Sequence, residues 1–333
     1  MRRRQESEAE KEQCATLVDE LEVLCGDGPP VGANGLELKR LSMELALAIL
    51  DRAQSLWKRE PRCSLALAET VLGLLEEPSG SAIVDPLRAD LEARAHAFRA
   101  NAQRILDDLW SAEGAFVAAQ AALGRGSRDP RERALVLTLL ATLRRDQRRF
   151  AESLRQCEQA AAIYRWVHEH HFEGRTLSLM AITQAYAGQA ELAIPLAERA
   201  AALIDPQRDL DLAAGLEHNM VHFLCAAGRP EDARARLPRA RRLAEAVGIQ
   251  KELRGLRWIE GQIAIALGER EDGERLLLGV REEFIAARNL YDTALVSLEL
   301  AAEYLDQGRT ADAKRLAEET LPIFQSLEVH REA

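Results

Sequence analysis

Apolar residues recur three and four positions apart along most of this chain, in segments of roughly 15 to 20 residues separated by short polar turns. That spacing places the apolar side chains on one face of an α-helix. From residue 86 onward the segments alternate at a nearly constant pace, which predicts twelve helices in six pairs. The predicted ranges are 86–106, 109–124, 130–146, 150–169, 174–187, 190–204, 208–227, 231–247, 250–267, 271–287, 290–307 and 311–327.

The first quarter of the chain is organised differently. Residues 5–25 predict a charged amphipathic helix, and the glycines and prolines of residues 26–35 form the strongest cluster of turn residues in the chain. A longer pair of helices follows, from about residue 36 to 57 and from Pro61 to about residue 76. We therefore expect three parts, which are a terminal helix and loop at 1–35, a divergent first helix pair at 36–85, and a repeat array at 86–333.

The helix pairs repeat with a fixed period. Glycine occurs every 40 residues, at Gly188, Gly228, Gly268 and Gly308. Three columns of mostly small residues keep the same period around this turn. They are Ala141, Ala181, Val221, Gly261 and Ala301; Ser153, Ala193, Ala233, Gly273 and Ala313; and Ala160, Ala200, Ala240, Val280 and Thr320. Small residues at repeating positions predict two helices that pack closely, with glycine in the turn between them.

Residues 86–327 resemble a lengthened tetratricopeptide repeat. In the last unit a small residue is followed three positions later by Tyr304, then by the turn glycine Gly308 and by Ala313. Two turns depart from the pattern, because Arg148 and Asp107 stand where glycine is expected. The resemblance implies an all-α fold, a right-handed α-solenoid of antiparallel helix pairs wound into a superhelix. It says little about function, because one fold can carry many unrelated partners.

Composition narrows the functional classes. Hydrophobic residues make up 47 % of the chain and aromatic residues only 5 %, as expected for an Ala- and Leu-rich helical array. The formal net charge of −10 argues against a general nucleic-acid binder. Five scattered cysteines without a C-x-x-C motif fit a reducing compartment. Without a signal-peptide pattern or a long apolar run, we expect a cytoplasmic protein that does not bind membranes, and the excess of Arg over Lys fits a GC-rich bacterial genome.

The resemblance also implies which residues line the concave surface, because the first helix of each pair faces inward in such superhelices. The candidates for a partner-binding groove are Arg94, Asn101, Arg104, Thr138, Thr142, Arg145, Arg175, Ser178, His218, Asn219, His222, Trp258 and Gln262. The last unit offers only Leu298, Glu299 and Ala302. Arginines that form forked hydrogen bonds, with Trp258 as an apolar anchor, would suit an extended peptide that carries carboxylates. We expect the groove to be centred on residues 138–262.

No phosphate loop, nucleophile elbow, kinase signature or dinucleotide motif occurs, so the sequence predicts a non-catalytic adaptor or regulator without a cofactor. Two alternatives stay open. One is a signal-sensing regulator, similar to bacterial peptide-responsive transcription factors, with a degenerate DNA-binding domain within residues 1–60. The other is a metal-binding or enzymatic protein that uses His218 and His222, four residues apart, with Cys225 as a third ligand.

Two further expectations concern surfaces. The arginine runs at 144–149 and 234–242 predict outer helix faces paired with acidic residues of the next helix. The final helix pair is followed by no polar capping helix, whereas repeat arrays need covered ends. Its apolar residues Leu298, Leu305, Leu316 and Phe324 would then be partly open. Either this end pairs with a second copy of the chain or with another partner, or the last helix covers it, and a homodimer through this end is one hypothesis.

Overall fold

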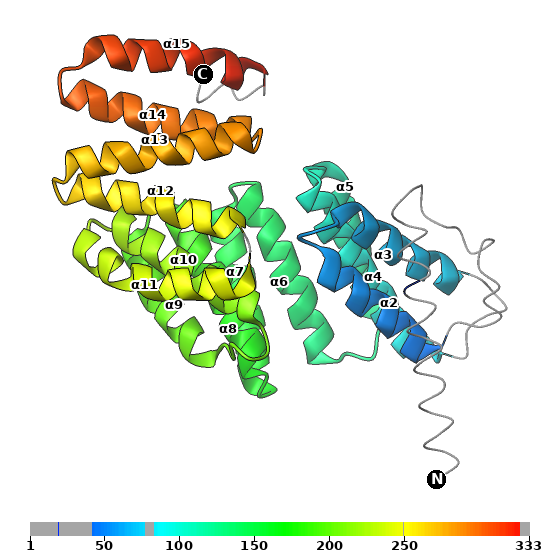
Figure 1. Ribbon diagram of the computed structural model, residues 1–333. Coiled ribbons are helices and arrows are strands. Elements are labelled where there is room, and N and C mark those ends of the chain that lie inside the picture. Colours follow the sequence, from blue (N-terminus) through cyan, green and yellow to red (C-terminus); the bar gives the residue numbers. More distant parts are fainter. Residues whose placement is uncertain (1–18, 20–41, 77–82, 249, 327–333) are drawn as a thin grey trace. The chain divides into compact units, whose positions relative to one another are not determined.

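The computed structural model describes residues 19, 42–76, 83–248 and 250–326, and these residues form fourteen α-helices and no β-strand (Figure 1). In chain order the helices are α2 (Met43–Leu56), α3 (Pro61–Glu76), α4 (Asp85–Ile105), α5 (Leu109–Arg125), α6 (Pro130–Asp146), α7 (Phe150–Trp166), α8 (His170–Tyr186), α9 (Ala190–Leu203), α10 (Leu210–Ala226), α11 (Pro230–Val247), α12 (Gln250–Ala266), α13 (Arg270–Ala286), α14 (Leu290–Asp306) and α15 (Thr310–Ser326). The all-α prediction is confirmed.

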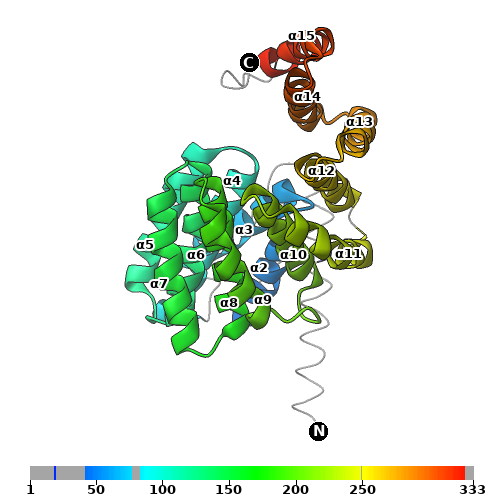
Figure 2. The ribbon, with the colours of Figure 1, turned by 90° about the vertical axis from the view of Figure 1, so that its left-hand side faces the viewer.

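The chain divides into two compact units, Met1–Thr183 and Gln184–Ala333. In the first unit each helix from α2 to α7 packs against its successor, and the first helices also touch one another, α2 against α4 and α4 against α6. In the second unit the same holds from α9 to α15, with α10 against α12. Figure 2 views α12 to α15 nearly end-on, as successive layers. Contact between first helices of successive pairs is the packing that the repeat pattern predicts.

The helix ends agree with the sequence prediction to within a few residues, with two larger errors. The helix predicted from about residue 36 begins at Met43, where the extended residue Ser42 caps it. The helix predicted to begin at residue 174 begins at His170, four residues earlier. The reason is the preceding turn, where His168 takes a left-handed conformation with φ 60° and the new helix starts directly after it. The predicted helix at 5–25 and the loop at 26–35 lie outside the described residues, apart from Asp19.

Left-handed residues occur about every 20 positions from residue 107 to 308, except near 208, and follow ten of the fourteen described helices. At Gly228 the φ angle is 72°, Gly228 N–H donates to Cys225 O at 3.0 Å and Arg229 N–H donates to Leu224 O at 2.9 Å. These two bonds form a Schellman motif, which satisfies carbonyl groups that a helix end leaves unpaired. Positive φ angles occur at Asp107, Arg128, Arg148, His168, Gly188, Gly228, Gly248, Gly268, Arg288 and Gly308. Arg148 and Asp107 therefore adopt the glycine conformation despite their side chains.

The small-residue columns mark the closest approach of paired helices, as predicted. Ser153 on α7 donates its hydroxyl to Ala141 O on α6 at 2.8 Å. In the pair of α12 and α13, a Cβ atom added to Gly273 would lie 2.5 Å from Ile265 Cγ1 and 3.0 Å from Gly261 O. Ala233, which stands 40 residues before Gly273 in the same column, is fully buried. These contacts leave no room for a larger side chain.

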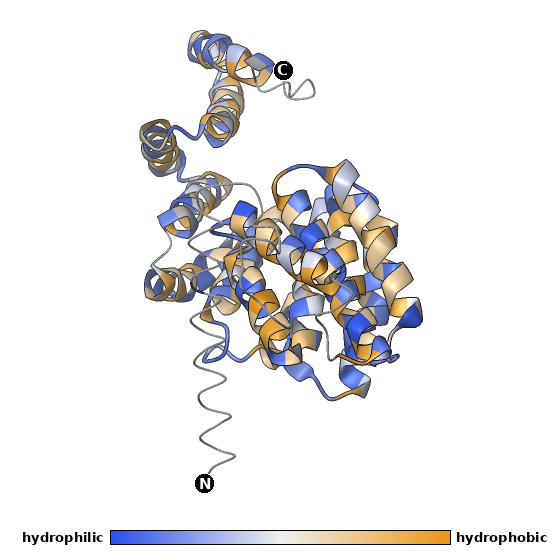
Figure 3. Ribbon diagram, turned by 90° about the vertical axis from the view of Figure 1, so that its right-hand side faces the viewer, coloured by the Kyte–Doolittle hydropathy of each residue, from blue (hydrophilic) through white to orange (hydrophobic). Residues whose placement is uncertain are grey.

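Figure 3 colours the ribbon by hydropathy, with hydrophobic residues in orange. The buried apolar side chains form clusters between neighbouring helices within each unit. The predicted open apolar face of the last pair is only partly present. Leu316 and Phe324 are buried, Leu298 is half-buried, and Leu305 is 58 % exposed. The proposed homodimer therefore stays a prediction, with a smaller exposed apolar surface than the sequence indicated. None of the described helices combines the length and apolar character needed to span a membrane.

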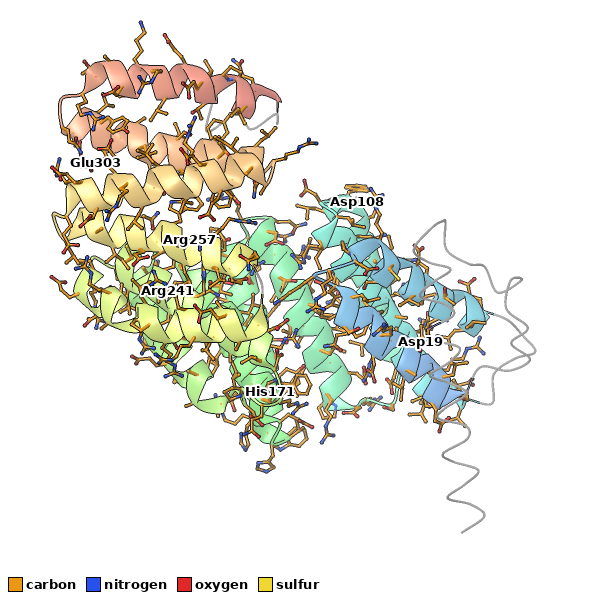
Figure 4. All side chains as sticks on the ribbon, viewed as in Figure 1. Asp19, Asp108, His171, Arg241, Arg257 and Glu303 are labelled. Carbon is orange, nitrogen blue, oxygen red and sulfur yellow. The ribbon has the colours of Figure 1, made fainter. Side chains whose placement is uncertain are left out.

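The arginine run of α11 pairs with glutamates on both of its neighbours. Arg241 contacts Glu260 on α12, and Arg236 and Arg239 lie 2.9 and 3.4 Å from the two carboxylate oxygens of Glu217 on α10. Figure 4 labels Arg241 together with Arg257, which contacts Glu283 on α13. The expectation that such runs are neutralised by acidic residues is confirmed for α11, although the partners are not confined to the next helix.

Candidate functional site on the first helices

In the first unit the predicted groove residues form a polar row that runs from helix to helix. Arg94 on α4 donates from Nε to Glu132 Oε2 on α6 at 3.1 Å, and a second bond joins the same two side chains. Ten residues further along the same helix, Arg104 on α4 donates to Asn101 at 3.1 and 3.0 Å and pairs with Asp146 on α6. The Arg94–Glu132 and Arg104–Asp146 contacts link residues about one repeat apart, so the row joins successive repeats.

Arg145 shares the same carboxylate. Its Nε and a terminal nitrogen donate to Asp146 Oδ1 at 3.0 and 2.8 Å. Arg104 and Arg145 thus converge on Asp146, while Arg94 is held by Glu132. We expected these guanidinium groups to take carboxylates from a ligand. They are already occupied by carboxylates of the chain, so a ligand would have to displace an internal partner.

The remaining predicted residues of this unit are mostly engaged with their own backbone. Thr138 and Thr142 donate to Ala134 O at 2.8 Å and to Leu139 O at 2.5 Å. Ser178 is 3 % exposed, which leaves it little contact with any ligand. Arg175 is half-buried, and its charge acts on the pKa of Tyr164, which burial raises to about 12. The threonines and Ser178 therefore serve the packing of the helices more than a binding surface.

In the second unit, the imidazole of His218 on α10 packs against Gly255 on α12. His218 Nδ1 lies 3.4 Å from Glu252 Oε2, and a Cβ atom on Gly255 would lie 2.6 Å from His218 Cε1. Burial lowers the pKa of His218 against the opposing effect of Glu252, so its imidazole is neutral at pH 7. The sequence analysis missed Gly255, whose absent side chain makes room for the ring.

The other predicted residues of α10 are more open. Asn219 is half-buried and His222 is exposed to solvent, yet partial desolvation still lowers the pKa of His222. Within the described part of the chain, no three His, Cys, Asp or Glu side chains are placed to hold a metal ion.

Glu299 on α14 joins two predicted residues of α12. Trp258 Nε1 donates to Glu299 Oε2 at 2.7 Å, and Gln262 Nε2 donates to Glu299 Oε1 at 2.8 Å. Burial raises the pKa of Glu299 above its ordinary value, and the two hydrogen bonds oppose that shift. Trp258 also packs edge-on against Phe284, with ring centroids 5.8 Å apart. The predicted apolar anchor is therefore held in place on both sides.

Two of the carboxylates that organise these rows, Glu132 and Asp146, were not predicted from the sequence, and Glu299 was named there only as an inward-facing residue of the last unit. Glu132, Asp146 and Glu299 stand 38, 42 and 41 residues after Arg94, Arg104 and Trp258. A search for complementary side chains one repeat apart would have found all three. Reading each helix separately could not, because the partner lies on the next first helix.

Two cavities lie elsewhere, between second helices. One of about 630 Å³ is lined by α11, α12 and α13 and is crossed by the Arg234–Glu269 and Arg241–Glu260 pairs. The other, of about 720 Å³, lies between α5, α6 and α7, with the exposed Trp166 at its edge. Neither contains a residue of the predicted groove.

No protein-family model matches this chain, and no curated protein is significantly similar to it in sequence. Solved structures do resemble it. A Rap protein complexed with competence and sporulation factor superposes with a TM-score of 0.69 at 14 % identity, over 87 % of this chain and 79 % of that one. The apo quorum sensor NprR from B. thuringiensis gives 0.62 at 15 % identity, over 97 % and 85 %.

A third similar structure is a signal-transduction ATPase with a tetratricopeptide repeat sensor from Pyrococcus horikoshii. Its TM-score is 0.65 at 15 % identity, over 96 % of this chain and 47 % of that one. Identities this low establish the fold alone. Together with the period of 40 residues and the contacts between first helices, they show that the chain has a tetratricopeptide-type helical repeat fold.

Proposed function

We propose that this protein is a non-catalytic adaptor or regulator that binds an extended peptide, or a segment of a partner protein, along the first helices of its repeats. The observation that carries the proposal is the row of polar side chains that passes from one first helix to the next. Arg104 and Asp146 show it in the first unit, and Trp258 and Glu299 in the second. Such cross-repeat bonds hold the side chains in place before a ligand arrives, which lowers the entropy cost of binding.

The structural neighbours support this role. A Rap protein has been solved in complex with competence and sporulation factor, and NprR is a quorum sensor. Both share the fold, and the fold presents its first helices as an extended surface. A single groove across residues 138–262 would need the two units to act together, so we propose binding for each unit separately.

The test compares two surfaces. The full-length protein and three variants would be used to capture partners from a lysate of the native host, with bound proteins identified by mass spectrometry. The first variant is Arg104→Ala with Arg145→Ala, the second is Trp258→Ala, and the control is Arg275→Ala on the outward helix α13. Arg275 is largely exposed and pairs only locally with Asp272.

We expect the control to retain every partner of the wild type. A partner lost with Trp258→Ala should show a loss of about 2 kcal/mol in binding free energy when measured with purified components, as for a central aromatic contact. If both groove variants keep all partners while Arg275→Ala loses one, the binding surface lies on the second helices and the proposal is wrong.

A second candidate function is a peptide-responsive regulator of transcription, favoured by the likeness to NprR over 97 % of this chain. The residues that would carry a DNA-binding domain, 1–60, are described only at residue 19 and from Ser42 onward. Retention of the purified protein on genomic DNA fragments, sensitive to a bound peptide, would support this function. Absence of retention at low salt would exclude it, because nucleic-acid affinity is greatest there.

A further inference from the structure

Glu299 differs from the other glutamates that lie deep on first helices. Glu132, Glu173, Glu217 and Glu303 each have an arginine partner, respectively Arg94, Arg165, Arg236 and Arg270. Glu299 has none among the described residues. Its hydrogen bonds come from an indole and an amide, both of them neutral groups. The four buried glutamates thus each have a counter-charge, whereas the half-buried Glu299 has none among the described residues.

The geometry of Glu299 leaves capacity for a further partner. A carboxylate has about four acceptor positions, of which Trp258 and Gln262 use one on each oxygen. The surroundings are partly desolvated, so the charge is weakly screened and its attraction for a cation is stronger than in water. Trp258, Gln262 and Glu299 are all half-buried and keep contact with solvent, so a ligand group can reach them.

The neighbouring helix α10 adds no positive charge to this place. Cys225 is close enough that the charge of Glu299 contributes to the raised pKa of its thiol, behind the larger effect of burial. His218 and His222 on the same helix are both depressed in pKa and neutral at pH 7. The groups shown to act on Glu299, which are Trp258, Gln262 and Cys225, are therefore neutral. One cation lies nearby on α12: the Arg254 guanidinium packs 5.8 Å from the centre of the Phe284 ring that Trp258 also contacts.

We infer that Glu299, oriented by Trp258 and Gln262, is the subsite for a cationic side chain of the bound peptide, an arginine guanidinium or a lysine ammonium. The inference rests on the proposed peptide-binding function. It reverses the charge that the sequence analysis expected, because there the groove was expected to bind ligand carboxylates. A guanidinium can form two parallel charge-assisted hydrogen bonds to one carboxylate, and Glu299 has one free position on each oxygen.

The probe is a set of random pentapeptide libraries with a constant central residue, which is arginine in one, citrulline in the second and glutamate in the third. Citrulline keeps the shape of arginine and removes its charge. Full-length wild type, Glu299→Gln and Glu303→Gln would each be tested. Glutamine at 299 can still accept from Trp258, and Gln262 can rotate its amide to accept in turn, so the fold should be kept. Thermal unfolding checks this for each variant.

We expect the wild type to retain the arginine library about tenfold more than the citrulline library, which corresponds to about 1.4 kcal/mol. Glu299→Gln should abolish that preference, and Glu303→Gln, the same substitution one turn away on α14, should keep it. The indole N–H resonance of Trp258 should shift when arginine peptides bind, which a merely structural role of Glu299 would not produce.

The other possible results would contradict either the cation subsite or the proposed peptide binding, as follows. Equal retention of the arginine and citrulline libraries, or an arginine preference that survives in Glu299→Gln, would reject the cation subsite and leave the groove proposal standing. Selection of the glutamate library would restore the original expectation of a carboxylate ligand. If no library is retained by any form of the protein, the cation subsite and peptide binding by the first helices are both wrong.

Discussion

At the residue scale, the left-handed backbone conformation that ends many of the helices is adopted both by glycine and by residues with a side chain. Gly308 and Arg288 both end a helix with positive φ, 75° and 54°. The left-handed conformation costs a residue with a Cβ atom roughly 1–2 kcal/mol, whereas glycine adopts it freely. Arginine at 288 therefore carries strain that glycine at 308 avoids, and no hydrogen bond or ion pair of the described Arg288 side chain offsets it.

Arg288→Gly should therefore raise the free energy of unfolding, by about 0.5 to 1 kcal/mol. The relieved strain exceeds the entropy that glycine adds to the unfolded chain, roughly 0.5–1 kcal/mol. The measurement is urea unfolding followed by circular dichroism. Gly308→Ala serves as the reciprocal control and should lower stability by about 1 kcal/mol. A loss of stability in Arg288→Gly would show that the arginine contributes contacts that outweigh the strain.

The raised pKa of Glu299 predicts that this group lowers the stability of the fold as pH rises. Its pKa is raised in the folded state from an ordinary value of 4.5. As pH rises above 4.5 the unfolded chain ionises first, so this group lowers the stability of the fold until pH passes the folded pKa. Relative to Glu299→Gln, the wild type should thus be less stable at pH 7 than at pH 4. Urea unfolding of both proteins at the two pH values measures the difference, and a constant gap would contradict the prediction.

Glu113 should show the opposite behaviour. Hydrogen bonding to Arg144 lowers its pKa to about 2, against a desolvation effect that raises it. A carboxylate with a depressed folded pKa stabilises the fold above its unfolded pKa, here 4.5, and loses that contribution as pH falls toward 2. Glu113→Gln should therefore flatten the fall of stability between pH 4.5 and 2. If Glu113→Gln lost as much stability between pH 4.5 and 2 as the wild type, other carboxylates would be responsible for that loss.

At the scale of the element, the helices follow from the sequence and their partners do not. The apolar spacing locates helices such as α10 and α12 to within two residues, because one face of each must be buried. The start of α8 is missed because a histidine, not a glycine, occupies the turn before it. The Asp146 and Glu299 contacts are missed because they join first helices about 40 residues apart. Local periodicity carries no information on which polar side chains meet across repeats.

The pair of α12 and α13 offers a test with the same substitution at two positions of one helix. Gly273→Ala puts a Cβ atom 2.5 Å from Ile265 Cγ1 and 3.0 Å from Gly261 O, whereas Gly279→Ala meets nothing within 4 Å. Overpacking costs roughly 1–3 kcal/mol, and replacing a helical glycine by alanine gains about 1 kcal/mol. Gly273→Ala should therefore destabilise the protein and Gly279→Ala should stabilise it, as measured by urea unfolding. If both variants changed the free energy of unfolding equally, the contacts of α13 with α12 at Gly273 would adjust to the added methyl group without cost, and the prediction would be wrong.

At the scale of the whole molecule, stability should be distributed by neighbourhood. In the first unit successive helices from α2 to α7 pack on one another, α2 contacts α4 and α4 contacts α6; the second unit is built in the same way from α9 to α15, with α10 against α12. In such an array, stability is approximately a sum of terms for each repeat and for each interface between adjacent repeats. A defect in one repeat should therefore weaken that repeat and its neighbours more than repeats further along.

Hydrogen exchange followed by mass spectrometry can measure this distribution with the same variant. In Gly273→Ala, amides of α12 and α13 should lose protection most, those of α11 and α14 less, and those of α4 and α6 should exchange as in the wild type. Gly279→Ala is the control and should show no loss of protection in α12 or α13. If Gly273→Ala instead increased exchange evenly from α4 to α15, the chain would unfold as one cooperative body. The cation subsite at Glu299 would then depend on the stability of every repeat, not only on that of α12, α13 and α14.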